Sequence, residues 1–154
     1  MIRRFDPSLW EDSNYGMTEN PLAMTPRVAT CSCRQLMLRA TEEPLRISIC
    51  HCHACQRRTG SVFGVQARFR TGSVVIRGKA TSYVRAGDSG ATGTFYFCPV
   101  CGATVYYQLE GLDDMVGVPI GAFANPNFEA PSISVYEDCM HHWVTLPDGI
   151  EHVP

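Results

Sequence analysis

From residue 28 onward, short runs of the chain alternate between apolar and polar residues. The clearest runs are residues 45–49 and 65–69, in which every second residue is apolar. This period of two is typical of a β-strand that buries one face. Turn-forming pairs such as Thr71-Gly72 and Asp113-Asp114 separate the runs. Further strands are predicted near residues 73–77, 80–85, 93–97, 103–108, 115–120 and 132–136.

Two segments depart from the β pattern. Residues 53–59 are predicted to form one short helix, which Gly60 would end. Residues 1–27 are interrupted by prolines and keep no apolar period for long, which predicts an irregular N-terminal arm. We therefore expect a single, mainly β domain of short antiparallel strands over residues 28–154.

The length and composition limit the class of protein. The chain has 154 residues, of which 45% are hydrophobic and 18% charged, as expected for one packed domain. No apolar run approaches the roughly 18 residues of a membrane-spanning helix. No hydrophobic segment follows Arg3-Arg4, so we expect neither a secretory signal nor a membrane partner, and predict a cytoplasmic location.

The net charge of −2 hides an asymmetry along the chain. All 13 Lys and Arg residues lie in residues 1–87, whereas residues 88–154 contain acids and no Lys or Arg. The segment 44–87 carries basic residues and no acid at all. Two domains of opposite charge would explain this, but no linker is evident near residue 87. We favour one β domain whose late strands pair with its early ones. A local positive field around the segment 44–87 would favour an anionic ligand.

Cysteine is the residue type with the most informative spacing. Seven of the eight cysteines fall into three groups, and Cys139 stands alone. Clustered cysteines in a reducing compartment indicate metal binding or catalysis rather than disulfides. The groups are Cys31-Ser32-Cys33, Cys50-His51-Cys52-His53-Ala54-Cys55 and Cys98-Pro99-Val100-Cys101-Gly102.

The spacing allows more than one division of these thiols between zinc ions. The preferred division joins the first and third groups in a closed four-thiolate site and leaves the middle group as an open three-thiolate site. A closed zinc site is typically structural, and an open one is typically catalytic. The rival is a single zinc ribbon that leaves three thiols unused, made of Cys52, Cys55, Cys98 and Cys101. Iron–sulfur ligation also uses thiolates.

The histidines and the eighth cysteine are weaker candidates. His51 and His53 lie within the middle group and could replace a thiolate, but in an extended segment they would point away from its sulfurs. The pair His141-His142 fits a surface or partly buried position. Cys139 fits a free thiol, with a fourth ligand as the alternative.

The ordered cysteine motifs resemble those of the glutathione-dependent formaldehyde-activating enzyme family, also called the centromere protein V-type domain. The similarity covers roughly residues 28–150. It implies a β-tent fold, in which two antiparallel sheets meet near a zinc-binding edge. It also implies two zinc ions, a structural one on Cys31, Cys33, Cys98 and Cys101 and a second one on Cys50, Cys52 and Cys55. The resemblance further rests on Gln56-Arg57, Gly60-Ser61, Phe97, and Trp143 with Leu146-Pro147-Asp148-Gly149.

The resemblance implies a carbon–sulfur lyase that acts like S-(hydroxymethyl)glutathione synthase and joins a thiol to formaldehyde. The open zinc would hold the incoming thiol as thiolate and polarise the aldehyde oxygen. Arg57 and Arg58 are the nearest basic residues and could attract a carboxylate-bearing thiol such as glutathione. A solvated helix face is the alternative explanation of both arginines.

Two other classes of function are kept as alternatives. One is a non-enzymatic binding module for chromatin, microtubule or protein partners, which the centromere-type relatives suggest. The sequence pI of about 6.2 is far from that of a basic nucleic-acid-binding domain, so we expect no nucleic-acid partner. The other is a zinc-stabilised fold in which the second site is only structural. The sequence gives no indication of the oligomeric state.

Overall fold

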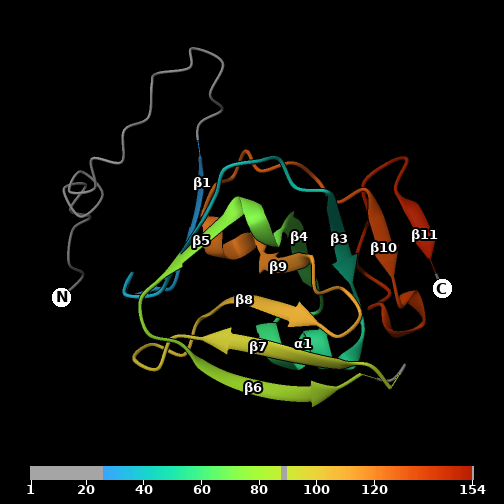
Figure 1. The fold of residues 1–154 in the computed structure, drawn as a ribbon. Coiled ribbons are helices and arrows are strands. Elements are labelled where there is room, and N and C mark those ends of the chain that lie inside the picture. The colour runs from blue at the N-terminus through green and yellow to red at the C-terminus, as the bar shows by residue number, and fades with distance from the viewer. Residues whose placement is uncertain (1–25, 88–89, 154) are drawn as a thin grey trace, which may run out of the picture.

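The computed structural model describes residues 26–87 and 90–153, and in them it shows a mainly β protein with two sheets and one α-helix (Figure 1). The predicted fold class is therefore confirmed. The strands are β1 (Arg27–Thr30), β2 (Met37–Ala40), β3 (Arg46–Cys50), β4 (Gly64–Arg70), β5 (Val74–Arg77), β6 (Thr81–Ala86), β7 (Thr92–Phe97), β8 (Thr104–Leu109), β9 (Met115–Pro119), β10 (Ile133–Val135) and β11 (Glu151–Val153).

The two sheets differ in size. The small sheet has the order β1-β2-β5 and is antiparallel. The large sheet has the order β11-β10-β3-β4-β9-β8-β7-β6. Late strands pair with early ones, because β9 pairs with β4 and β10 pairs with β3. In Figure 1 the large sheet runs from β10 and β11 at the right to β6 at the bottom.

One edge of the large sheet differs from the antiparallel arrangement that the sequence predicts. β10 runs parallel to β3 on one side and to β11 on the other. Parallel neighbours need a long crossover, and residues 136–150 provide one between β10 and β11. The alternation of apolar and polar residues does not report strand direction. The strands predicted from the sequence include neither β2 nor β11. The three residues of β11 are all exposed and show no apolar face.

The helix α1 (His53–Thr59) lies where the sequence predicts it. The Cys52 sulfur caps its first turn by accepting a hydrogen bond from the Cys55 amide at 3.3 Å. Gly60 ends the helix in the left-handed conformation, with φ of 67°. Short 3-10 helices follow three of the strands: η2 (Thr71–Ser73), η3 (Ile120–Phe123) and η4 (Glu137–Cys139).

The pleat of β3 and β4 divides their side chains between two environments. Ile47, Ala67 and Phe69 lie in the apolar core, where β1 and β2 contribute further buried side chains. Arg46 is opposite Arg68 in the ladder between the two strands, and these residues lie on the other face. One face of these strands therefore builds the core, and the other is free to build a site.

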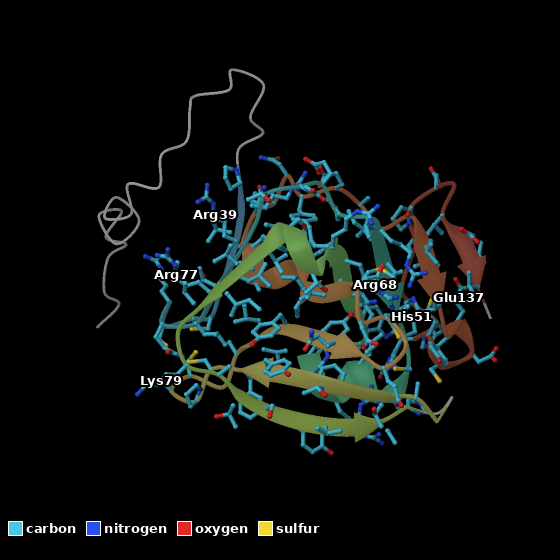
Figure 2. All side chains as sticks on the ribbon, viewed as in Figure 1. Arg39, His51, Arg68, Arg77, Lys79 and Glu137 are labelled. Atoms are coloured by element: carbon cyan, nitrogen blue, oxygen red, sulfur yellow. The ribbon has the colours of Figure 1, made fainter. Side chains whose placement is uncertain are left out.

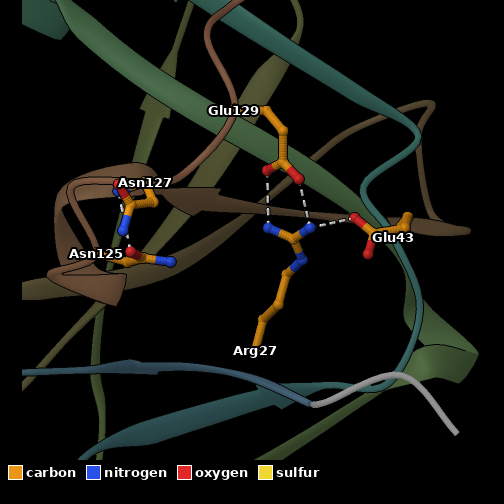
Figure 3. Close-up of polar contacts among 5 residues, drawn as sticks. All are labelled: Arg27, Glu43, Asn125, Asn127 and Glu129. Carbon is orange, nitrogen blue, oxygen red and sulfur yellow. Dashed lines mark hydrogen bonds and ion pairs between the residues drawn. The ribbon is translucent and has the colours of Figure 1, made fainter.

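A cluster of charges joins the start of β1 to the segment before β10. The guanidinium of Arg27 donates to both carboxylate oxygens of Glu129, at 2.8 and 2.6 Å, and also contacts Glu43 (Figure 3). The same guanidinium lies 4.8 Å from the centroid of the Phe128 ring. β1 begins at Arg27, which is the last residue of the predicted N-terminal arm. Residues 1–25 of that arm lie outside the described residues.

Within the described residues, no helix has the length and hydrophobicity needed to span a membrane.

Candidate metal centres

Two hairpin connections bring four cysteine sulfurs together. Cys31 and Cys33 lie in the turn between β1 and β2, and Cys98 and Cys101 lie in the turn between β7 and β8. Their sulfur atoms all lie within 4.8 Å of one another. The Cys33 sulfur is 3.6 Å from that of Cys31 and 3.5 Å from that of Cys98.

Backbone geometry shapes both of these turns. The Cys31 amide donates to the Leu36 carbonyl, and the Leu36 amide donates to the Cys31 sulfur at 3.3 Å. In the second turn, the Gly102 amide donates to the Cys98 carbonyl, and Gly102 has φ of 73°. A left-handed residue after the second cysteine lets the backbone curl around the sulfurs.

Gln35, in the turn between β1 and β2, links the four-cysteine cluster to Lys79 in the connection between β5 and β6. Its amide nitrogen donates to the Cys98 sulfur at 2.9 Å and to the Lys79 carbonyl at 2.7 Å. Its amide oxygen accepts from the Lys79 backbone N–H at 3.0 Å. Burial acts to raise the pKa of Cys98, but hydrogen bonds from Gln35 and from the backbone N–H groups of Cys101 and Val100 outweigh it and lower this pKa to about 6. The site thus favours the thiolate form of Cys98.

The middle group of cysteines forms a second cluster at the start of α1. Cys50 ends β3, Cys52 caps α1, and Cys55 lies in the first turn of the helix. Their three sulfur atoms also lie within 4.8 Å of one another. The hydrogen bond from Cys50 lowers the pKa of Cys55 to about 5, and the nearby Arg58 guanidinium also stabilises the Cys55 thiolate. The same bond raises the pKa of Cys50 above its ordinary value.

Both clusters fit a tetrahedral metal ion. Zinc–thiolate bonds of about 2.3 Å place two sulfurs of one tetrahedron about 3.8 Å apart, close to the two contacts measured in the four-cysteine cluster. The Cys98 and Cys55 pKa values below the ordinary thiol range supply the deprotonated ligand that a metal requires. The four-cysteine and the three-cysteine cluster can therefore each hold a metal ion, the first with a full set of protein ligands and the second with one position open.

The three-cysteine cluster lies in the wall of a cavity of about 430 Å³. The cavity lies on the polar face of β3 and β4 and extends across β7 and β8 toward β10. Its polar lining includes Ser48 and Gln66, which are joined by a hydrogen bond of 3.0 Å. Among the described residues the basic side chains in its wall are Arg46, Arg58, Arg68 and Arg85, and the acidic one is Glu110.

The cavity is therefore a positively charged space beside three thiols. Arg58, one of the two predicted arginines, lines it, whereas Arg57 is exposed and lies outside it. Figure 2 shows Arg68 in the same part of the molecule as His51, while Arg39, Arg77 and Lys79 lie at the opposite side. A cavity of this charge suits an anionic ligand.

Tyr107 is a polar group in this wall that the sequence analysis missed. Its phenol is buried, and burial raises its pKa to about 12, so the hydroxyl is protonated at neutral pH. The ring lies against Gly117 of β9, where a Cβ atom would come within 2.3 Å of it. Phe95 stacks on the same ring, with 5.2 Å between the centroids. Glycine at position 117 thus makes room for Tyr107 beside the cavity.

The remaining candidates lie outside the two clusters. The His51 ring is fully buried beside Phe63, and its two nitrogens have no hydrogen-bond partner among the described residues. His53 is exposed. The Cys139 carbonyl accepts from the Gln56 side chain at 3.0 Å, and His141 contacts the oxygen of that side chain at 3.2 Å. Gln56 therefore ties the segment after β10 to α1.

The sequence contained a signal for Arg46 and Arg68, two cavity residues that were not predicted as site residues. Arg46 and Arg68 occupy polar positions of the two clearest alternating runs, within the segment that lacks acids. That pattern predicts a polar, basic strand face, but it does not show that the face is covered and faces a cavity. The position of Tyr107 depends on the pairing of β8 with β9, which leaves no local signal.

Fold and site together define a mainly β protein with two thiol-rich centres that can bind metal ions. The family model for glutathione-dependent formaldehyde-activating enzymes matches residues 26–139, and the chain belongs to this family. This membership supports a glutathione-related, formaldehyde-activating function and an enzymatic role on formaldehyde adducts.

A solved structure has a similar fold. It is the crystal structure of a Rhodobacter sphaeroides protein, with a TM-score of 0.50 and 23% sequence identity, and the match covers 66% of this chain and 90% of that chain. A search of the curated proteins finds no significant match.

Proposed function

We propose that the protein is a zinc-dependent enzyme of the carbon–sulfur lyase type that adds the thiol of glutathione to formaldehyde, giving S-(hydroxymethyl)glutathione. The observation that carries this proposal is the position of the three-cysteine cluster in the wall of a cavity lined by four arginines. Thiol chemistry and an anionic substrate are thereby brought to one place. The family membership agrees with both substrates.

In this proposal the two clusters have different tasks. Cys31, Cys33, Cys98 and Cys101 hold a structural zinc, because they already supply four ligands. Cys50, Cys52 and Cys55 hold the second zinc, which when bound would supply a positive charge that favours thiolate and polarises a carbonyl oxygen.

The arginines bind and orient the thiol substrate. Glutathione carries two carboxylates, and a guanidinium can hold a carboxylate through two parallel hydrogen bonds. Arg68 is half-buried beside Tyr107, and burial lowers its pKa without removing its charge at neutral pH. A carboxylate held by Arg68 or Arg46 would place the thiol end of the molecule within the same cavity as the three cysteines.

The addition itself is a balanced proton and electron-pair transfer. The thiol gives its proton to solvent water, and the sulfur forms a bond to the formaldehyde carbon. The π pair of the carbonyl moves to the oxygen, which then takes a proton from solvent water to become a hydroxyl. We assign the hydrogen bond to this oxygen to the Tyr107 phenol, which is protonated and lies in the cavity wall.

The rate of adduct formation tests this proposal. Zinc-loaded protein would be mixed with glutathione and ¹³C-formaldehyde, and magnetisation exchange between free formaldehyde and the adduct would give the rate. We expect a rate above the uncatalysed background that scales with protein concentration. A rate equal to the background would reject the lyase assignment.

A pair of arginine variants on one strand tests the role of the cavity. Arg68 lines the cavity, whereas Arg70 lies two residues further along β4 and is exposed outside it. Arg68→Gln should raise the KM for glutathione about tenfold because it removes a partly buried charge partner of the substrate. Arg70→Gln should leave KM unchanged, and equal effects of the two substitutions would argue against a substrate contact.

The alternative function, a binding module for chromatin, microtubule or protein partners, has no specific observation in its favour. Four basic side chains of the acid-free segment line the cavity beside the cysteines. Salt-dependent retention on heparin would favour that alternative.

A further inference from the structure

A second hollow lies next to the cysteine cavity and plays no part in the proposed reaction. It is a groove of about 550 Å³ between α1 and the strands β6, β7 and β8. The groove and the cavity share Arg58, Arg85 and Phe95 in their walls. The two spaces are therefore neighbours, separated by these side chains.

Aromatic rings form the floor of the groove. Tyr83 of β6 is opposite Phe95 of β7 in the ladder, and Phe97 is the next residue of β7 on the same face. All three line the groove, and Tyr83 keeps 60% of its surface exposed. A flat, accessible aromatic surface can stack on a planar group of a ligand.

Arginines surround these rings. Arg57 and Arg58 come from α1 and Arg85 comes from β6. The guanidinium carbons of Arg58 and Arg85 lie 5.7 and 5.4 Å from the centroid of Phe95. The Nε atom of Arg58 is buried and has no hydrogen-bond partner in the described part of the chain. A buried N–H donor without an acceptor is costly, and the side chain that carries it borders the groove.

The charged side chains that line the groove are all basic among the described residues. Its lining contains three arginines and, among the described residues, no acidic side chain. We propose that this groove is a second ligand site, distinct from the cysteine cavity, which binds a planar aromatic anion such as an aryl carboxylate or sulfonate. The ring of the ligand stacks on the exposed Tyr83, and its anionic group pairs with the arginines. This assignment does not depend on the proposed lyase reaction.

Titration with 2-naphthoate, followed by amide chemical shifts of the zinc-loaded full chain, tests the proposal. We expect saturable shifts at groove positions such as Ala54 and Thr104. The neutral analogue 2-naphthalenemethanol and the non-aromatic cyclohexanecarboxylate should bind more weakly, because each lacks one of the two contacts. Shifts confined to cavity positions such as Ser48 and Gln66 would overturn the assignment to the groove.

Variants in the groove supply the second part of the test. Arg57→Gln should weaken naphthoate binding about twofold to fivefold, as expected for the loss of an accessible charge pair. Tyr83→Ala should weaken it to a similar degree. Arg70→Gln and Val84→Ala are controls outside the groove, on β4 and on the other face of β6. Naphthoate affinity that is the same in Arg57→Gln, Tyr83→Ala and the controls would overturn the proposal.

Discussion

Cys98 and Cys55 both favour the thiolate form, but different neighbours stabilise their charges. The Cys98 sulfur accepts neutral hydrogen bonds from Gln35 and from the backbone, within a cluster of four sulfurs. Cys55 lies in a cluster of three sulfurs beside the Arg58 guanidinium and borders the cavity. At the scale of residues, the first environment suits a closed structural site, and the second suits a site that receives a ligand.

Cys52→Ser tests the three-cysteine site with little risk to α1, because serine is a preferred helix N-cap. We expect the variant to fold, to keep one zinc ion and to lose adduct formation down to the background rate. Cys139→Ser is the matched control, since Cys139 lies outside both clusters. Loss of both zinc ions in Cys52→Ser, measured by elemental analysis, would contradict the separation of the two sites.

Tyr107→Phe tests the proposed hydrogen bond to the substrate oxygen. The ring can keep its contact with Gly117, and only the hydroxyl is removed. We expect kcat for adduct formation to fall about 100-fold, with zinc content unchanged. Tyr106→Phe is the control, because the neighbouring ring lies in the core and stacks on Tyr96. A kcat equal to that of the wild type would remove Tyr107 from the mechanism.

At the scale of elements, the connection between β5 and β6 positions Gln35 against the four-cysteine cluster. Gly78 lies in this connection with φ of 97°, and a Cβ atom there would come within 1.8 Å of the Gln35 carbonyl oxygen. The next residue, Lys79, makes two hydrogen bonds with the Gln35 side chain. Only glycine allows the two chain segments to approach this closely.

Gly78→Ala is therefore expected to lower the free energy of unfolding by about 2–3 kcal/mol, because both the left-handed conformation and the close approach are lost. Chemical denaturation of the zinc-loaded protein measures this change. Gly72→Ala is the matched control, since a Cβ atom at position 72 meets nothing within 4 Å and φ is not left-handed there. Equal stability of the two variants would show that the connection tolerates a side chain.

Glu129→Gln tests the charge cluster that joins β1 to the segment before β10 (Figure 3). We expect a loss of about 0.5–1 kcal/mol, as for other accessible ion pairs. The hydrogen bond from Arg27 lowers the pKa of Glu129, so this stabilisation is present above the ordinary glutamate range and is lost as the pH falls through the lowered value. The difference in unfolding free energy between wild type and variant should therefore be smaller at pH 3 than at pH 7. Glu42→Gln serves as the control.

Local sequence patterns predicted most of the elements. The alternating runs around Ile47 and Ala67 became β3 and β4, and the segment from His53 became α1 because Gly60 marks its end. β11 was missed because its exposed residues carry no period, and the parallel edge was missed because pairing direction is set by a long connection. The two cysteine clusters could be predicted from the sequence because the spacing within each motif limits which sulfur atoms can come together.

At the scale of the whole molecule, the two sheets place the cysteine clusters in different surroundings. The four-cysteine cluster joins the turn of the small sheet to a turn of the large one, whereas the three-cysteine cluster opens toward the arginine-lined cavity. The sequence could not show this cavity, since its wall combines β3 and β4 with β7, β8 and β10. Such long-range pairing depends on the complete fold and not on any local pattern.

Zinc content per chain tests the division of seven cysteines into two metal sites most directly. Elemental analysis of the zinc-loaded, gel-filtered wild-type protein should give two zinc ions per chain, one for each cluster. One zinc ion per chain in the wild type would contradict the account, because the three-cysteine cluster would then be without the metal on which the proposed chemistry depends.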